Sequence, residues 1–378
     1  MHDARTHKSE SKMSSNSKLE SLTVLRFVAA ASVVIFHYGR DTLAYYLLPA
    51  VLAAGSIVVT FFFVLSGFVI SIANSKRPID IHRFYVDRLA RIFPVYFVAL
   101  ILFVMAFDSN LLGADFLLSA TMMQSWVHPY ALTLNMPGWS ISVEVFFYVV
   151  APILIILYGR GASWIRWAVF ALLLWLFTQM SLSMVNKPPF NPGFPSLGHN
   201  LINYFPVSHL CSFVLGFAGG VAYRQGVLSK SLTDSKKVIL LVFFMAFSWL
   251  LSKNGKNLNS LLGTNFAYGS SFYSIVFLPI IYFCALANKI ISKYIAFPFV
   301  VLLGEASYSL YILQMPVHVY FERVFSGFVF SGPEQRFWMY FAILNFLSIA
   351  SYLIIEKPIS TVVKNRFSGG HLKSQATS

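Results

Sequence analysis

The sequence predicts an all-α membrane protein, a polytopic membrane helix bundle with about ten transmembrane helices and both termini in the cytoplasm. Of its 378 residues, 57% are hydrophobic and only 11% are charged, whereas soluble globular domains carry about 25% charged residues. The apolar residues form long runs, and the Lys and Arg residues fall mainly between alternate runs. So few charges cannot cover the surface of a soluble protein of this size.

The long apolar runs define the predicted spans, since a membrane-crossing helix needs about 20 mostly apolar residues. In chain order they are 22–40, 49–74, 92–107, 139–158, 164–183, 206–223, 238–252, 270–288, 299–319 and 337–356. The third run is short, and we expect it to start near Pro94. Residues 113–126 are also apolar but contain Asp115, so we expect them to form a helix at the membrane interface.

Lys and Arg residues orient the predicted bundle, because short cytoplasmic loops are enriched in them. With the N-terminus inside, most of the 28 Lys and Arg residues lie on the cytoplasmic side, and residues 108–138 contain none. The outer side holds Arg40, Lys187, Lys253, Lys256, Arg323 and Arg336. The net charge of +14 is therefore mainly a topology signal. We expect no nucleic-acid partner, since no basic cluster with interleaved aromatic residues stands on a soluble surface.

The two ends of the chain are polar, and we expect residues 1–18 to be a disordered cytoplasmic tail and 367–378 a second cytoplasmic tail. The polar stretch before the first apolar run is long, and no small-residue cleavage site follows that run, so we expect no cleavable signal peptide. Two cysteines, Cys211 and Cys284, exclude a disulfide scaffold and fall at different predicted depths.

Ionisable side chains within the spans are the first functional candidates, because charge at membrane depth is costly. Arg26 and His37 share the first helix, about 16.5 Å apart along its axis and about 20° apart around it. Arg26 is interpreted either as a functional cation or as an anchor that extends to the inner interface. His37 is interpreted either as a reactive group or as an interfacial residue hydrogen-bonded to Asp41.

Glu144 is the second candidate, and it belongs to a polar stripe with Ser140 and Tyr148 at helical spacing. We expect it to face the bundle interior in the outer half, at a depth similar to His37. Two titratable groups at one depth suit an acid/base pair around one reaction point; the alternative is a buried structural pair.

Arg88 and Arg91 lie one helical turn apart at the inner end of the third span, and two guanidinium groups on one face suit a phosphate. The alternative is a positive-inside anchor with a salt-bridge ladder from Arg83 through Asp87 to Arg91. The sequence has no Walker or Rossmann glycine pattern, and its nine His residues show no metal-ligand spacing, so no metal is expected.

Two further segments each have two interpretations. Ser66 and Gly67 indicate a close contact between helices rather than a nucleophile. Residues 187–195, rich in Pro and Phe, either cap a cavity and stack on a sugar or form a stiff connector.

Six short motifs follow one another from about residue 20 to 366. They are Leu25-Arg26 with His37, Phe62–Phe68, Arg88–Pro94, Trp139–Glu144, Gly304–Tyr311 and Glu356–Pro358. In this order they resemble the motifs of acyltransferase family 3, the integral-membrane acyltransferases that O-acylate surface glycans. The resemblance implies a membrane acyltransferase domain over residues 19–366, located in the cell inner membrane.

The resemblance also implies roles for the candidates. Acetyl-CoA would enter from the cytoplasm, with Arg26, Arg88 and Arg91 holding its phosphates. His37 would act as general base or transient acyl carrier, with Glu144 orienting it or balancing its charge. The cavity lining would include Ser140, Tyr148 and Tyr308. The acceptor would be a hydroxyl of an extracytoplasmic glycan, such as O-antigen, capsule or another exopolysaccharide.

The chain departs from the family pattern at several points. Gln314 stands where the family often has His, with His318 one turn later, and we assign neither a role. Phe27 replaces a motif glycine, and we expect no fused hydrolase-like periplasmic domain of the kind that some family members carry.

Alternatives of substrate and class remain open. The acyl group could differ, and the acceptor could be a small lipid or a macrolide. A different class is a proton-coupled secondary transporter in which His37 and Glu144 relay protons, although the inverted repeats common in transporters are not visible. The oligomeric state is left open.

Overall fold

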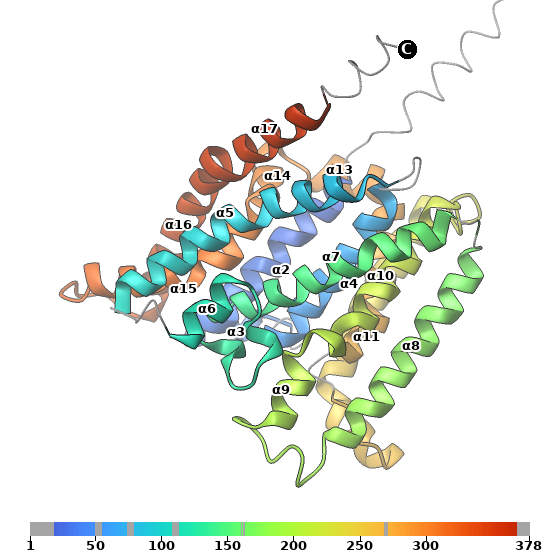
Figure 1. Cartoon of the computed structure of the whole chain (residues 1–378), viewed down its shortest axis with the longest axis horizontal. Helices are drawn as coiled ribbons and strands as arrows, with labels where there is room; N and C mark the ends of the chain where they lie inside the picture. The colour runs from blue at the N-terminus through green and yellow to red at the C-terminus, as the bar shows by residue number, and fades with distance from the viewer. Residues whose placement is uncertain are drawn as a thin grey trace, which may run out of the picture.

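The computed structural model describes residues 19–49, 55–73, 79–107, 113–159, 161, 163–267 and 271–368. Within these ranges the regular structure is helical, without strands, and every one of the predicted apolar runs falls on helix (Figure 1). The longer helices are α2 (Glu20–Tyr38), α4 (Gly55–Ala73), α5 (Ile81–Phe107), α7 (Gly138–Gly159), α8 (Trp164–Val185), α10 (Leu210–Arg224), α11 (Asp234–Leu262), α12 (Ser274–Leu286), α15 (Ser307–Val324) and α16 (Pro333–Ser351). The shorter helices are α3 (Leu43–Leu47), α6 (Ala114–Ala120), α9 (Leu197–Asn203), α13 (Asn288–Ile295), α14 (Pro298–Glu305) and α17 (Lys357–Ser368).

The helices have the length and composition of a membrane bundle. In the described chain, 7 are long and apolar enough to cross a membrane, or up to 9 if each of two bent pairs is one span. Ile57–Ala73 in α4 adds a shorter apolar helix. The all-α polytopic class is therefore confirmed. The predicted tail 1–18 and nearly all of 367–378 lie outside the described residues.

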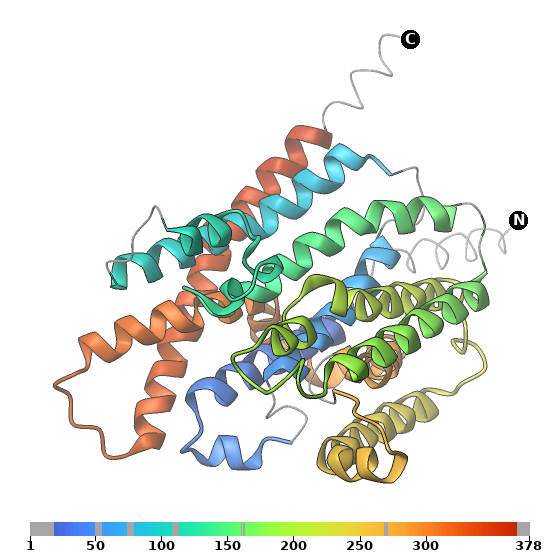
Figure 2. The same cartoon turned by 60° about the horizontal axis from the view of Figure 1, so that its bottom comes forward.

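The short helices and turns that connect the longer helices lie at two opposite ends of the bundle. Ser21 at the start of α2 contacts α13, where its backbone N–H donates to Asn288 Oδ1 at 3.0 Å. Figure 1 shows α13 and α17 at one end of the molecule, and α3 and α6 toward the other. The turn from α15 to α16 lies at the α3 end in both views (Figures 1 and 2). Which end faces the cytoplasm remains a prediction.

Two predicted spans differ from the structure. The third begins at Ile81, not near Pro94, and continues through Pro94, so Arg88 and Arg91 lie inside α5. The ninth is broken, because α14 and α15 meet at a bend of 61°. Gly304 lies so close to α2 that a Cβ there would be 2.2 Å from the Thr23 carbonyl oxygen. Thus α14 packs backbone to backbone on α2, and α15 takes a different direction.

The centre of the bundle is the contact between α4 and α10. A Cβ on Gly67 would lie 2.0 Å from Phe213 O, and one on Gly216 would lie 1.9 Å from Val64 O. Only glycine allows this approach, which confirms the interpretation of Gly67 as a packing residue. Toward the periphery, only 22% of the α8 window and 11% of the α11 window are buried, as expected of helices that face lipid.

Residues 113–137 fold into the bundle and set the depth at which α7 begins. Gln124 Nε2 donates to Tyr96 Oη at 3.0 Å and to Gly138 O at 2.8 Å. Asn135 Nδ2 donates to Ile312 O at 3.0 Å. Because Ile312 lies well inside α15, α7 begins below the end of the bundle. Residues 113–126 do contain a helix, α6, followed by a 3₁₀ turn; its place at the membrane interface stays a prediction.

Candidate active site

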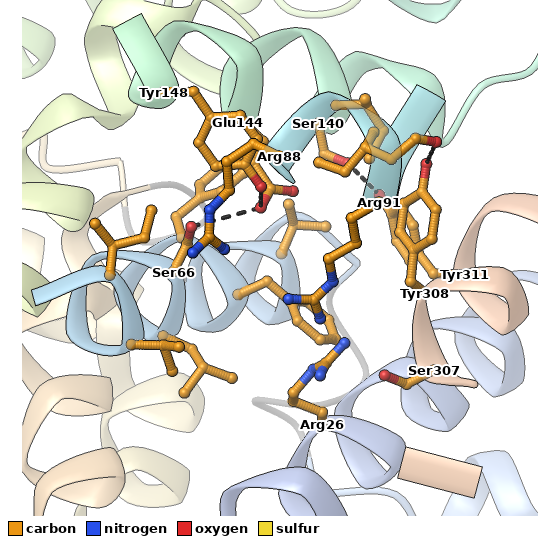
Figure 3. A pocket seen from close by; sticks show the side chains of 18 residues that line it. Arg26, Ser66, Arg88, Arg91, Ser140, Glu144, Tyr148, Ser307, Tyr308 and Tyr311 are labelled. Atoms are coloured by element: carbon orange, nitrogen blue, oxygen red, sulfur yellow. Dashed lines mark hydrogen bonds between the residues drawn. The ribbon is translucent and has the colours of Figure 1, made fainter. Parts of the chain in front are cut away.

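A cavity of about 130 Å³ lies among α2, α4, α5, α7 and α15 (Figure 3). Seven of the residues predicted for the site line it: Arg26, Arg88, Arg91, Ser140, Glu144, Tyr148 and Tyr308. His37 is not among the lining residues. The structure therefore brings together the predicted phosphate-binding residues, the predicted polar lining and one of the two predicted catalytic residues.

The cavity is marked by three guanidinium groups that converge from two helices. Figure 3 shows Arg26 of α2 beside Arg91 of α5, with Arg88 nearer Glu144. In the described chain none of the three forms a salt bridge. Arg88 Nε is buried without a hydrogen-bond partner there, and its guanidinium lies over Phe84 at 5.5 Å and Tyr148 at 5.9 Å. Buried cations normally have partners, so the cavity is suited to an anion.

The predicted ladder from Arg83 to Arg91 forms only in its first step. Arg83 Nε lies 3.8 Å from Asp87 Oδ2, whereas Arg91 faces the cavity. The two arginines of the cavity-facing turn are thus separate from the exposed ion pair on the same helix.

Glu144 is held at the opposite wall by two hydroxyl groups. Tyr148 Oη donates to Glu144 Oε1 at 2.6 Å, and Ser66 Oγ donates to the same oxygen at 3.5 Å. Glu144 also lies within electrostatic range of Arg26. A carboxylate near buried arginines lowers the desolvation penalty of their charges, and Glu144 does so without forming a salt bridge with them in the described chain.

The remaining polar lining is fixed by contacts between helices. Tyr308 Oη donates to Ile92 O at 2.7 Å, which ties the start of α15 to α5. Ser140 Oγ lies 3.0 Å from Tyr311 Oη, and Tyr311 donates to Pro137 O at 3.3 Å. These hydrogen bonds therefore fix the positions of Tyr308, Ser140 and Tyr311 in the cavity wall.

His37 lies outside the cavity, and its contact with α4 gives its separation from the cavity in helical turns. A Cβ on Gly55 would be 3.6 Å from His37 Nε2. Val59, Phe62, Ser66 and Val69 all line the cavity, and with Gly55 they form one helical face at spacings of three and four residues. The cavity thus reaches Val59, and His37 lies one helical turn further along the same face.

The expected pairing of His37 with Glu144 is wrong for this structure. Glu144 contacts α4 at Ser66 and His37 contacts it at Gly55, about 16 Å apart along the helix. The depth of Glu144 was inferred on the assumption that α7 begins at the membrane surface, whereas residues 113–137 place its start deeper. A hydrogen bond from His37 to Asp41 is also absent from the described chain. The chemical roles of His37 and Glu144 remain predictions.

Several contributors were not predicted as site residues. Glu356 is 5% exposed at the end of a π-helical turn, Tyr352–Glu356, and it accepts a hydrogen bond from Ser309. It lies within electrostatic range of Arg91 and Arg26. Ser66 and Tyr311 line the cavity directly. The available signal was that all of these residues belong to the ordered motifs.

Comparison with known proteins places this geometry in a family. A family model described as an acyltransferase domain matches residues 19–357. The chain belongs to acyltransferase family 3. Its motif residues Ser66, Arg88, Arg91, Glu144 and Tyr308, carried on four helices, line one cavity.

A relative and the solved structures complete the comparison. This acyltransferase family member is 28% identical over 237 residues to the acyltransferase MdmB of Streptomyces mycarofaciens. The match covers 56% of this chain and 59% of the relative, so it spans less than two thirds of that protein. No solved structure matches significantly.

Proposed function

We propose that this protein is a multi-pass enzyme of the cell inner membrane that moves an acetyl group from cytoplasmic acetyl-CoA to a hydroxyl of an extracytoplasmic glycan. The family membership and the apolar helices support membrane acyl transfer. The donor, the acceptor and the membrane are the proposed part.

One observation carries the proposal: the face of α4 that lines the arginine cavity contacts His37 one helical turn beyond the cavity. The cavity runs along this face from Val69 to Val59. One turn further, a Cβ on Gly55 would lie 2.9 Å from the Phe36 ring and 3.6 Å from His37 Nε2. The three arginines would hold the donor phosphates, since guanidinium groups bind phosphate in a fixed fork. The thin acyl-carrying arm would extend along α4, and its thioester would reach His37.

His37 would be the general base. The acceptor hydroxyl would give its proton to the imidazole while its oxygen bonds to the thioester carbonyl carbon. The carbon–sulfur bond would then break, and the leaving thiolate would take the proton from the imidazolium. Such proton transfer contributes about 10²–10⁴-fold, and a cavity closed to water limits thioester hydrolysis. Glu144 would balance the arginine charges near the donor, because it lies beside Arg88 and not beside His37.

The decisive experiment compares surface-glycan masses from cells with the gene, without it, and with His37→Ala. We expect an acetyl mass increment that disappears without the gene and falls by about 10²-fold or more in the variant. His82→Ala is a matched control, because His82 is exposed at the start of α5. A normal acetyl content in a well-expressed His37→Ala strain would remove His37 from the reaction, and an unchanged mass without the gene would refute the function.

A further inference from the structure

A second and wider cavity, of about 650 Å³, lies at the end of the bundle where α2 ends. Its walls come from three places: Tyr38 to Thr42 after α2, His318 to Glu322 on α15, and Phe328 to Tyr340 around the start of α16. These segments meet at the α3 end of the molecule (Figure 2). Its volume is in the range of small-molecule sites, and none of the roles assigned above uses it.

One wall of this outer cavity is a connected row of polar groups. Arg336 Nε donates to Glu322 Oε1 at 3.1 Å, and a second nitrogen of the same guanidinium bonds Glu322 Oε2. On the other side of the carboxylate, His318 Nε2 lies 3.5 Å from Glu322 Oε1. The side chains of His318 and Glu322 are both 32% exposed. The row is therefore oriented by its own contacts and still open to a ligand.

Aromatic rings line the cavity next to this row. The His318 ring stacks on Tyr38 with centroids 4.2 Å apart, and Tyr340 meets both rings edge-on. Phe328 and Phe330 also line the cavity and pack together at 4.8 Å, and the Arg336 guanidinium lies over the Phe330 ring at 5.7 Å. Tyr340 is fixed in turn, because its hydroxyl donates to Gln314 O at 2.8 Å. Flat ring faces and a polar row thus line the same space.

The charges of the lining indicate a neutral, hydroxylated ligand. Glu322 is neutralised by Arg336, and Asp41 adds a negative charge at the lining. An anionic ligand would meet the unbalanced Asp41, and an acyl chain would have to desolvate Arg336, Glu322 and His318. A sugar ring suits both the rings and the polar row, because its C–H face packs on aromatic rings and its hydroxyls bond to carboxylate, guanidinium and imidazole groups.

We propose that this outer cavity binds a pyranose ring of the acceptor, with Tyr38 and Phe330 as the stacking surfaces and His318, Glu322 and Arg336 as the hydrogen-bonding row. The inference rests on the proposed function and adds the location of the second substrate. Tyr38 forms a wall of the outer cavity, and its ring centroid is 6.0 Å from that of His37. His37 is thus next to a residue that lines the outer cavity, and it contacts α4 one turn beyond the arginine cavity.

The test measures sugar binding without any donor. Purified protein in lipid nanodiscs is titrated with a panel of methyl pyranosides of gluco, galacto, manno and rhamno configuration, and binding is followed by saturation-transfer NMR. We expect at least one pyranoside to bind, and Glu322→Gln and Phe330→Ala each to weaken it by roughly tenfold or more. Glu322→Gln keeps the side-chain shape, and the elution profile on size-exclusion chromatography checks folding.

Two control substitutions of the same residue types are available on α16. Glu334→Gln alters an exposed carboxylate that bonds Leu43 N and Trp338 Nε1, and Phe346→Ala removes a ring that is 71% exposed. Neither residue lines the outer cavity, so both controls should bind like the parent protein. Binding by none of the panel, or equal losses in variants and controls, would overturn the proposal.

The outcome is independent of the proposed reaction. If the pyranoside binds but no acyl transfer is ever detected, the sugar site stands and the function fails. If transfer occurs with unchanged acceptor KM in Glu322→Gln and Phe330→Ala, the function stands and the sugar site fails.

Discussion

Replacing Arg88 with Gln tests whether Arg88 binds the donor or only anchors α5 in the membrane. Arg88 Nε is buried without a hydrogen-bond partner in the described chain, so the folded state gains little from it. A hydrogen bond to a charged group contributes about 1.5–3 kcal/mol. At about 1.4 kcal/mol for each factor of ten, we expect the KM for acetyl-CoA to rise roughly 10- to 150-fold.

Stability should change much less than donor binding. Arg88→Gln loses two cation–π contacts, at 5.5 and 5.9 Å, which are close to the outer limit of about 6 Å for such contacts. It leaves no salt-bridged carboxylate unpaired and reduces the repulsion among the three arginines. We therefore expect the free energy of unfolding to fall by about 1 kcal/mol at most.

The assay follows release of the CoA thiol at varied acetyl-CoA and fixed acceptor, with thermal unfolding measured on the same sample. Arg83→Gln is the matched control: it removes the same charge from the same helix, and the Arg83 side chain does not line the cavity. Its pair with Asp87 is partly exposed, of a kind worth about 0–1 kcal/mol. A donor KM that changes equally in Arg83→Gln and Arg88→Gln would show that the inner end attracts the donor only by its overall charge, and the proposed phosphate contact would be refuted.

Two further predictions concern glycines, with Gly159→Ala as a common control because a Cβ there meets nothing within 4 Å. In Gly55→Ala the new methyl would lie 2.9 Å from the Phe36 ring and 3.6 Å from His37 Nε2. The Phe36 ring would have to shift beside the imidazole, so we expect kcat to fall by about 10²-fold with an unchanged donor KM; a normal kcat would place the thioester elsewhere. In Gly67→Ala the methyl would lie 2.0 Å from Phe213 O, and since backbone cannot move aside, we expect loss of monodisperse protein on size-exclusion chromatography; a parental elution profile would contradict the close packing of α4 on α10.

The helical spans were predictable because the bilayer leaves the backbone no alternative. Without water, each backbone polar group must be bonded within its own helix, so length and hydropathy are sufficient signals. The start of α5 was misplaced because Pro94 suggested a boundary, although a helix tolerates proline where the freed carbonyl finds another partner. The bend between α14 and α15 depends on the contact of Gly304 with Thr23, which is a tertiary effect without a local signal.

The sequence predicted most residues of the site but not how far from the end of the bundle each of them lies. Arg26, Arg88 and Arg91 stood out as charges in apolar helices, and they do meet at one cavity. The depth of Glu144 was not predictable, because it depends on how residues 113–137 fold beneath the end of the bundle. The contribution of Glu356 was also hidden, since its approach to the arginines depends on the π-helical turn that precedes α17.

The unequal volumes of the two cavities bear on the order of the substrates. The arginine cavity, at about 130 Å³, is too small for a bulky acceptor but suits part of a thin chain; the outer cavity, at about 650 Å³, is large enough for a sugar ring. If both substrates entered from the arginine end, the acceptor would have to pass the smaller cavity. Entry from opposite ends avoids this and, under the proposed function, brings the hydroxyl and the thioester to His37 from two directions. The volumes therefore favour a donor from the arginine end and an acceptor from the α3 end, independently of the Lys and Arg distribution that predicted the same orientation.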